Sequence, residues 1–388
     1  MIYSDFTYSG NRTELDKTFR EYSIKKQEDN SVIVVENGYI LPHKENEKMT
    51  YGLGGVIDQN RNFVKESGFS LIMGEKKNDW GGYYDINLEE NICISGEVIF
   101  AGFVNNNEWG HFLIDWSTRL WYALKENQHS KIIFCARTEI EQFLPNIQRL
   151  MELGGIDIKR IKIMSPSDRP MLCKKIIIPQ EALCHEYYSD NYFRLFKNAI
   201  DQVKSMKINL KTYDKIYMTR TLLEPKKEIG EKYIEDFFVK EGYFVIAPEK
   251  LTVAEQIYYI CNCKEIASIE GSAAHNVIFA EKENIHQIIL EKKKGCNIRQ
   301  LILDEIKKTK TDYVGIYKEN KFRPTIDDLF EVEVSKNLMS YLQISIKKST
   351  YMYYKFVNSS EFWLTYFIRI CRRLNAKIYR KIRGMVVQ

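Results

Sequence analysis

The chain has 388 residues, of which 44% are hydrophobic and 28% are charged, and its formal net charge is +5. This length predicts about two or three domains, and the 20 Gly and 8 Pro are too few for a fibrous or low-complexity polymer. Residues 361–388 alone carry a net charge of +6, so the other 360 residues are nearly neutral at −1. A nearly neutral body argues against nucleic-acid binding, which needs basic residues spread over one face of the fold.

The cysteines and the apolar runs bear on the compartment. The eight cysteines are scattered, without a CxxC pair or a Cys/His spacing typical of a metal site, so we expect them to be reduced. The first residues lack the basic flank and apolar run of a signal peptide, and no apolar stretch approaches the roughly 20 residues that span a bilayer. We therefore expect a cytoplasmic protein, with attachment to the inner face of a membrane left open.

Short β-like runs fill the first 100 residues, and the pattern then changes. Residues 105–124 predict one long helix, and after it come a strand at 131–135, a helix at 139–153 and strands at 160–164 and 175–178. Strands that alternate with helices at this spacing indicate an α/β layer with parallel strands.

The second half predicts a doubly wound α/β unit. Its strands are expected at 215–219, 243–247, 265–269 and 285–290, with helices at 229–241 and 252–262 and a short helix from Gly271. The second of these helices opens with Thr252 and Glu255, which fit a capping box. Such sheets bind ligands, often nucleotides, at the carboxyl ends of their strands. The polar stretch 307–341 is predicted to be a connection.

The helix predicted at 105–124 carries a candidate acid–base group. His111, Asp115 and Arg119 are spaced at i, i+4 and i+8, which predicts one ridge of the helix. A carboxylate beside a histidine can orient the ring and hold its proton affinity near neutrality. The alternative is a surface ion pair between Asp115 and Arg119, with His111 satisfied in the core.

A second candidate is the segment Gly271, Ser272, Ala273, Ala274, His275 and Asn276, which follows a predicted strand. Small residues let a ligand approach the backbone, and free N–H groups at a helix start attract phosphate. His275 and Asn276 are expected to donate hydrogen bonds to phosphate oxygens. The alternative is a tight turn whose small residues only allow the helix to pack on the sheet.

Three further residues lie where the predicted sheet would place them near the same ligand. Arg220 directly follows a strand and can grip a phosphate with two hydrogen bonds. Glu249 follows another strand and can accept from ribose hydroxyls, and Gln256 lies one helical turn further on. The alternatives are two solvated loop charges and a surface amide.

Four motifs together resemble glycosyltransferase family 61. They occur in the family's order as Asn107 to Asp115 with Arg119, Tyr217 to Arg220, Pro248 to Thr252 with Glu255 and Gln256, and Gly271 to Asn276 with Phe279. The resemblance covers roughly residues 90–300.

The resemblance implies a GT-B fold, in which two Rossmann-like doubly wound domains face a cleft, here followed by a C-terminal helical tail. We expect an acceptor-side domain at 1–205, a donor-binding domain at 206–325 and a helical extension at 326–388. The implied reaction is inverting, metal-independent transfer of a hexosyl, pentosyl or N-acetylhexosaminyl group from a nucleotide sugar, without a cofactor. The implied acceptor is an oligosaccharide or a lipid-linked glycan of a bacterial capsule or other surface polysaccharide.

Matched by position, His111 and Asp115 fall in the acceptor-side motif, and either is expected to be the catalytic base. Arg220, Glu249, Gln256, Gly271, Ser272, His275 and Asn276 fall in the donor-side motifs. The sequence departs from the family where a second Arg is common, and Lys226 or Lys227 is the expected substitute. That departure supports one rival, a non-catalytic glycan-binding or assembly subunit. Another nucleotide-using enzyme on the same scaffold is a second rival, since the fold does not fix the function.

The basic segment 361–388 predicts an amphipathic helix at the end of the chain. A helical wheel of 361–388 predicts an apolar face with Trp363, Phe367, Ile370, Leu374 and Ile378. The opposite face carries Arg369, Arg372, Arg373, Arg380 and Arg383, whereas Lys381 lies on the apolar side. Such a helix can lie on an anionic membrane, where each basic residue contributes on the order of 1 kcal/mol. The alternative is a helix packed across the domains or into a partner subunit.

Overall fold

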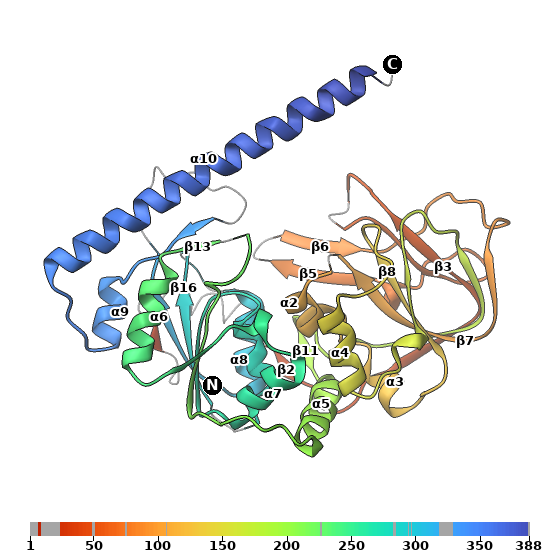
Figure 1. Ribbon diagram of the computed structural model, residues 1–388. Helices are drawn as coiled ribbons and strands as arrows, with labels where there is room; N and C mark the ends of the chain where they lie inside the picture. The colour runs from red at the N-terminus through yellow and green to blue at the C-terminus, as the bar shows by residue number, and fades with distance from the viewer. Residues whose placement is uncertain are drawn as a thin grey trace.

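The computed structural model describes residues 7–8, 24–48, 51–73, 76–105, 107–225, 227–281, 285–293, 295, 297–317 and 329–386. Two six-stranded sheets lie side by side, with helices around them, and a long C-terminal helix runs along the outside of the second one and projects beyond it (Figure 1). The α/β class predicted from the sequence is confirmed.

The first sheet has the strand order β4-β3-β10-β7-β8-β9. Its strands are β3 (Val32–Lys44), β4 (Leu53–Ile57), β7 (Ile92–Val104), β8 (Lys131–Ala136), β9 (Ile161–Met164) and β10 (Met171–Pro179). Strands β7 to β10 run parallel, whereas β3 is antiparallel to both of its neighbours. The short hairpin of β5 (Phe69–Met73) and β6 (Lys76–Trp80) lies beside this sheet (Figure 1).

The second sheet is wholly parallel, in the order β1-β17-β16-β15-β12-β14. Its strands are β1 (Thr7–Tyr8), β12 (Lys215–Met218), β14 (Phe244–Ile246), β15 (Glu265–Ile269), β16 (His286–Glu291) and β17 (Lys310–Gly315). The connecting helices include α6 (Glu231–Lys240), α7 (Val253–Asn262) and α8 (Ile298–Lys307). The capping box at the start of α7 is confirmed, since Thr252 and Glu255 each accept a hydrogen bond from the other's backbone amide.

The helix predicted at 105–124 is wrong as one continuous element. It begins as α2 (Trp109–His111), continues as a π-helical turn over Phe112–Trp116 and resumes only at α3 (Trp121–Lys125). The Ser117 amide donates to the Phe112 carbonyl, five residues back, instead of four. The extra residue in this turn rotates everything after it, so Arg119 leaves the face that carries His111 and Asp115.

The prediction that 307–341 only connects is also wrong. Within it, β17 pairs with β1 and β16 in the second sheet, and α9 covers Lys336–Tyr341. Polar residues such as Thr311 are buried in β17 because the ladder satisfies their backbone groups.

The junction between the sheets is packed by apolar side chains. α4 (Pro145–Leu153) and α5 (Arg194–Ser205) meet α7 there, and one buried cluster includes residues from both sheets. The ring of Phe279 lies 5.8 Å from that of Phe196 and 6.3 Å from that of Trp109, centroid to centroid. Residues near the junction therefore have fixed partners on both sides.

The final element, α10 (Lys348–Val386), is held at its middle. Phe362, Tyr366 and Ile370 pack against Ile229 and Leu329, while the helix continues beyond this contact (Figure 1).

Candidate active site

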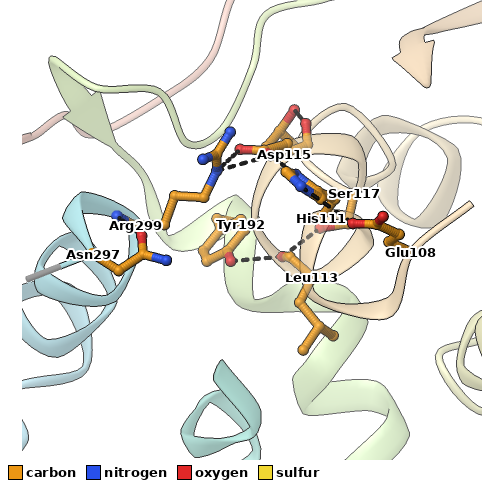
Figure 2. Close-up of polar contacts among 9 residues, drawn as sticks. Glu108, His111, Leu113, Asp115, Ser117, Tyr192, Asn297 and Arg299 are labelled. Carbon is orange, nitrogen blue, oxygen red and sulfur yellow. Dashed lines mark hydrogen bonds and ion pairs between the residues drawn. The ribbon is translucent and has the colours of Figure 1, made fainter. Parts of the chain in front are cut away.

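A histidine, an aspartate and an arginine meet at the junction of the two sheets (Figure 2). His111 Nδ1 lies 2.6 Å from Asp115 Oδ2, and Arg299 Nε donates to both carboxylate oxygens at 3.0 Å. Asp115 is buried, which would raise its pKa, but the hydrogen bond from His111 and the charge of Arg299 outweigh burial and hold that pKa below its usual value. Asp115 is therefore ionised at neutral pH and accepts from both neighbours.

The second nitrogen of His111 is less constrained. Because the Asp115 carboxylate only accepts, His111 Nδ1 carries a proton, and in the neutral ring Nε2 is left with its lone pair. Nε2 lies 3.5 Å from a Glu108 oxygen, and the side chain is 31% exposed. The ring stacks on Trp116 at 5.3 Å, which fixes its plane. This arrangement suits a general base that takes a proton at Nε2.

Arg119 does not join this group, so the predicted ridge of three residues is wrong, and so is the alternative pair of Asp115 with Arg119. The buried Arg119 guanidinium donates to the carbonyls of Pro179 at 2.7 Å and Gly68 at 3.0 Å. Its place beside Asp115 is taken by Arg299 from α8, 184 residues along the chain. Nothing in the sequence near His111 points to a partner at that separation.

A surface pocket gathers most of the predicted donor-binding residues. Arg220, Glu249, Gln256, Ser272 and Asn276 all line it, together with Trp109 from the other side of the junction. Trp109 Nε1 donates to Asn276 Oδ1 at 2.8 Å, so α2 is tied directly to the pocket. Parallel strands bring their carboxyl ends to one edge, which explains why residues far apart in sequence meet here.

Arg220 is not a solvated loop charge. Its Nε donates to Glu228 at 3.1 Å, and Lys292 Nζ donates to the other oxygen of the same buried carboxylate at 3.0 Å. A Cβ built on Gly271 would lie 3.7 Å from Arg220 Nη1 and 3.9 Å from Lys292 Nζ, so both cations border this glycine. Its φ of +141° is one that favours glycine.

Lys292 is a residue that the sequence reasoning missed. It directly follows β16, as Arg220 follows β12, so the rule that selects Arg220 selects Lys292 as well. It supplies a second cation beside Arg220, the role for which the sequence predicted Lys226 or Lys227. Lys226 lies outside the described residues.

Gln256 is not the surface amide that the alternative interpretation expected. It is buried, and its Nε2 donates to the carbonyls of Pro248 at 2.8 Å and Leu251 at 3.3 Å. These bonds hold the loop that carries the exposed Glu249 at the edge of the pocket.

The segment after Gly271 differs from the expectation in two ways. Ala274–Phe279 is a six-residue 3₁₀ helix, too short for the dipole of a full α-helix to develop. His275 is buried and lies 2.8 Å from Gln300 through its Nδ1, and burial lowers its pKa to about 4. A neutral ring that is hydrogen-bonded within the core is unsuited to binding phosphate, so the prediction that His275 donates to a phosphate oxygen is wrong. Ser272 and Asn276 do line the pocket.

Neither a cluster of metal-ligating side chains nor a membrane-spanning helix occurs among the residues that the structure describes. No group of three or more His, Cys, Asp or Glu side chains among them is arranged to hold a metal ion. Within the same residues, no helix is both long and apolar enough to cross a membrane.

Comparison with family models supports the resemblance seen in the sequence. The family model described as Glycosyltransferase 61 matches residues 109–286, a span that runs from α2 to the start of β16 and includes Asp115, Arg220 and Asn276. No curated protein matches the chain.

Proposed function

Residues 109–286 belong to glycosyltransferase family 61, and on this premise we propose that the protein transfers a sugar from a nucleotide-sugar donor to a glycan acceptor with inversion and without a metal. Membership of the family implies glycosyltransferase activity. The observation that supports the rest is a pocket that contains Arg220 and also Trp109, two residues before His111, while Lys292 shares the Glu228 carboxylate with Arg220.

In this proposal the donor diphosphate lies against Arg220 and Lys292. A sugar diphosphate carries negative charge that grows as the bond to the sugar breaks, and fixed cations stabilise the leaving group most at that point. The two cations share Glu228, so their positions are set before the donor arrives. They take the role that a divalent cation has in other transferases.

The acceptor hydroxyl attacks the anomeric carbon while the bond from that carbon to the phosphate oxygen breaks. The hydroxyl proton passes to His111 Nε2, and the nucleoside diphosphate leaves. Asp115 holds the ring in the tautomer with Nδ1 protonated and stabilises the imidazolium that forms. The sequence left His111 and Asp115 open as the base; the burial of Asp115 and its bond to Arg299 favour His111.

We also propose the GT-B arrangement, with domains near 1–205 and 206–325 and an extension at 326–388. Two sheets with parallel strands and a site at their junction support it, although β1, from the N-terminal end, adds to the second sheet. The proposed acceptor is a glycan of a surface polysaccharide. A non-catalytic subunit is the alternative, and Lys292 weakens its main support, the missing second Arg.

Nucleotide-sugar binding tests the proposal. We expect one UDP-, GDP- or CMP-linked sugar of a panel to stabilise the protein, by about 2.7 kcal/mol at 100 times its Kd. Arg220→Met should weaken that binding at least tenfold, because a charge-assisted hydrogen bond contributes roughly 1.5–3 kcal/mol. Arg169→Met, in an exposed loop between β9 and β10, is the control and should bind normally. Absence of binding by every nucleotide sugar would overturn the proposal.

We further propose that α10 contacts an anionic membrane surface. Trp363, Leu364, Phe367, Ile368 and Leu374 are large, apolar and exposed, and Met352, Tyr353 and Phe356 extend the stripe. The exposed Arg372 and Arg373 lie within the same helix, and four more basic residues follow, at positions whose side chains are not described. The helical wheel is wrong at two positions. Arg369 is buried and not exposed on the basic face, and Ile370 packs against the cluster that contains Ile229 and Leu329.

Flotation with vesicles tests this contact. The full chain should float with phosphatidylglycerol vesicles and much less with phosphatidylcholine vesicles, because the apolar stripe and the positive charge act together. A variant with Trp363→Ser, Phe367→Ser and Leu374→Ser should stay at the bottom. If the variant floated as well as the wild type, the proposed membrane contact would be wrong. A wild-type dimer that the three substitutions dissociate would instead show that α10 binds a partner subunit.

A further inference from the structure

A second pocket lies at the carboxyl end of β10, in the first sheet. Glu181, His185 and Tyr187 line it from the segment after that strand, and Lys65, Phe69 and Trp80 line it from the opposite side. The carboxyl edge of a parallel sheet is where α/β proteins bind ligands, so its position matches that of the donor pocket in the second sheet.

This pocket lies next to a small cavity that reaches Asp115. A narrower cavity contains both Asp115 and Arg299, and it shares Phe69, Glu181 and His185 with the larger pocket. The larger pocket therefore lies close to Asp115, the hydrogen-bond partner of His111, and it shares no lining residue with the donor pocket.

The pocket's charges differ from those around Arg220 and Lys292. Its lining has two cations, Lys65 and Arg119, against four carboxylates, Glu66, Asp79, Glu181 and Glu186. An excess of carboxylates disfavours a phosphate but suits hydroxyl groups, which donate hydrogen bonds to them. The partly exposed aromatic rings of Phe63, Phe69 and Tyr187 offer flat apolar surface for the C–H face of a sugar ring.

Glu181 and His185 have polar capacity that the protein does not use up. Arg119 is the cation nearest to Glu181, at 3.8 Å, but its guanidinium already donates to two backbone carbonyls. Burial raises the pKa of Glu181 to about 7, although Arg119 opposes the rise. His185 Nδ1 is buried without a hydrogen-bond partner, and Nε2 lies 3.5 Å from Glu186. Buried polar atoms without a protein partner are uncommon outside sites that take a ligand or water.

We propose that this pocket binds the acceptor as an uncharged sugar ring, with Glu181 and His185 hydrogen-bonded to its hydroxyls and its reactive hydroxyl directed toward His111. The inference rests on the proposed transfer reaction and adds to it the site and the chemical class of the second substrate. The anionic donor and the neutral acceptor then occupy separate pockets, and the excess of carboxylates lies in the acceptor pocket.

Acceptor kinetics of pocket variants test the assignment. The probes are p-nitrophenyl glycosides of common hexoses, pentoses and N-acetylhexosamines, used with the nucleotide sugar that binds. Glu181→Gln should raise the acceptor KM at least tenfold and remove an ionisation near pH 7 from the pH profile of kcat/KM for the acceptor. Donor affinity should stay within twofold of wild type. Glu152→Gln, on exposed α4 surface, is the control and should match wild type in every respect.

A second variant covers the case in which Glu181→Gln does not fold. Glu66 is exposed at the pocket edge, so Glu66→Arg leaves the core intact while it narrows the entrance, and it should raise the acceptor KM at least threefold. Unchanged acceptor KM and pH profile in the folded variants, with donor binding and transfer intact, would overturn the pocket assignment alone. Failure of the wild type to bind any nucleotide sugar would instead overturn the proposed reaction.

Discussion

Two histidines of this protein each sit beside carboxylates, but the surroundings differ. His111 has Asp115 on Nδ1, and Glu108 lies 3.5 Å from its Nε2. His286 has Glu265 on Nδ1 at 2.6 Å and Asp312 on Nε2 at 2.8 Å, so both nitrogens are occupied. The first ring lies at the junction of the sheets, whereas the second lies at the amino ends of β15 and β16.

The difference separates a chemical role from a structural one. Two carboxylates raise the pKa of His286 to about 9, so this ring stays charged and has no nitrogen left to accept a proton. His111 has no short hydrogen bond to Nε2 among the described residues and is 31% exposed, and a base needs such an accessible nitrogen before it needs any particular pKa. A histidine beside an acid is thus a candidate base only where its second nitrogen is open.

The largest effect is expected from His111→Ala. Loss of a general base reduces kcat by about 10²- to 10⁴-fold, while donor binding should hardly change because His111 does not line the donor pocket. Transfer and nucleotide-sugar binding should be measured together. His129→Ala, in an exposed loop, is the control. If folded His111→Ala turned over as fast as the wild type, His111 would not be the base, and the contrast with His286 would be wrong.

A smaller and different effect is expected from His286→Gln, which should lower stability and leave transfer per folded molecule unchanged. Since the pKa of His286 in the folded state is raised from 6.5 to about 9, its stabilisation is complete below pH 6.5 and is lost as the pH rises through 9. We expect about 2 kcal/mol at pH 6, after a discount for partial exposure, and much less at pH 9.5.

Urea unfolding of wild type and His286→Gln at both pH values measures this difference. If the gap in unfolding free energy were as large at pH 9.5 as at pH 6, the charge of His286 would not be its source. A fall in kcat without a loss of stability would give His286 a role in the reaction and erase the contrast with His111.

The sequence predicts the parallel strands and the donor-side residues because both follow local rules. Apolar runs ending at Met218 and Ile269 predict strands, and a parallel sheet then brings Arg220 and Ser272 to one edge. What local rules miss depends on distance along the chain or on a subtle backbone change. Arg299 reaches Asp115 across 184 residues, and one π-helical turn moves Arg119 away from His111.

The buried network of His275 shows the same limit. A small-residue turn followed by His and Asn fits a phosphate site, but the direction of the His275 side chain is set by Gln300, which in turn donates to Asp304 at 2.7 Å. That contact needs α8 to lie beside the 3₁₀ helix. Side-chain direction in a short helix is thus fixed by its tertiary neighbour.

The smallest effect is expected from Glu108→Gln, which tests how open the second nitrogen of His111 is. Glu108 is 56% exposed and lies 3.5 Å from Nε2, and exposed pairs of this kind contribute roughly 0–1 kcal/mol. We expect kcat to change less than threefold, with the same sensitivity to salt as in the wild type. A loss approaching that of His111→Ala would show that Glu108 engages Nε2 during the reaction, and His111 would then be held on both nitrogens as His286 is.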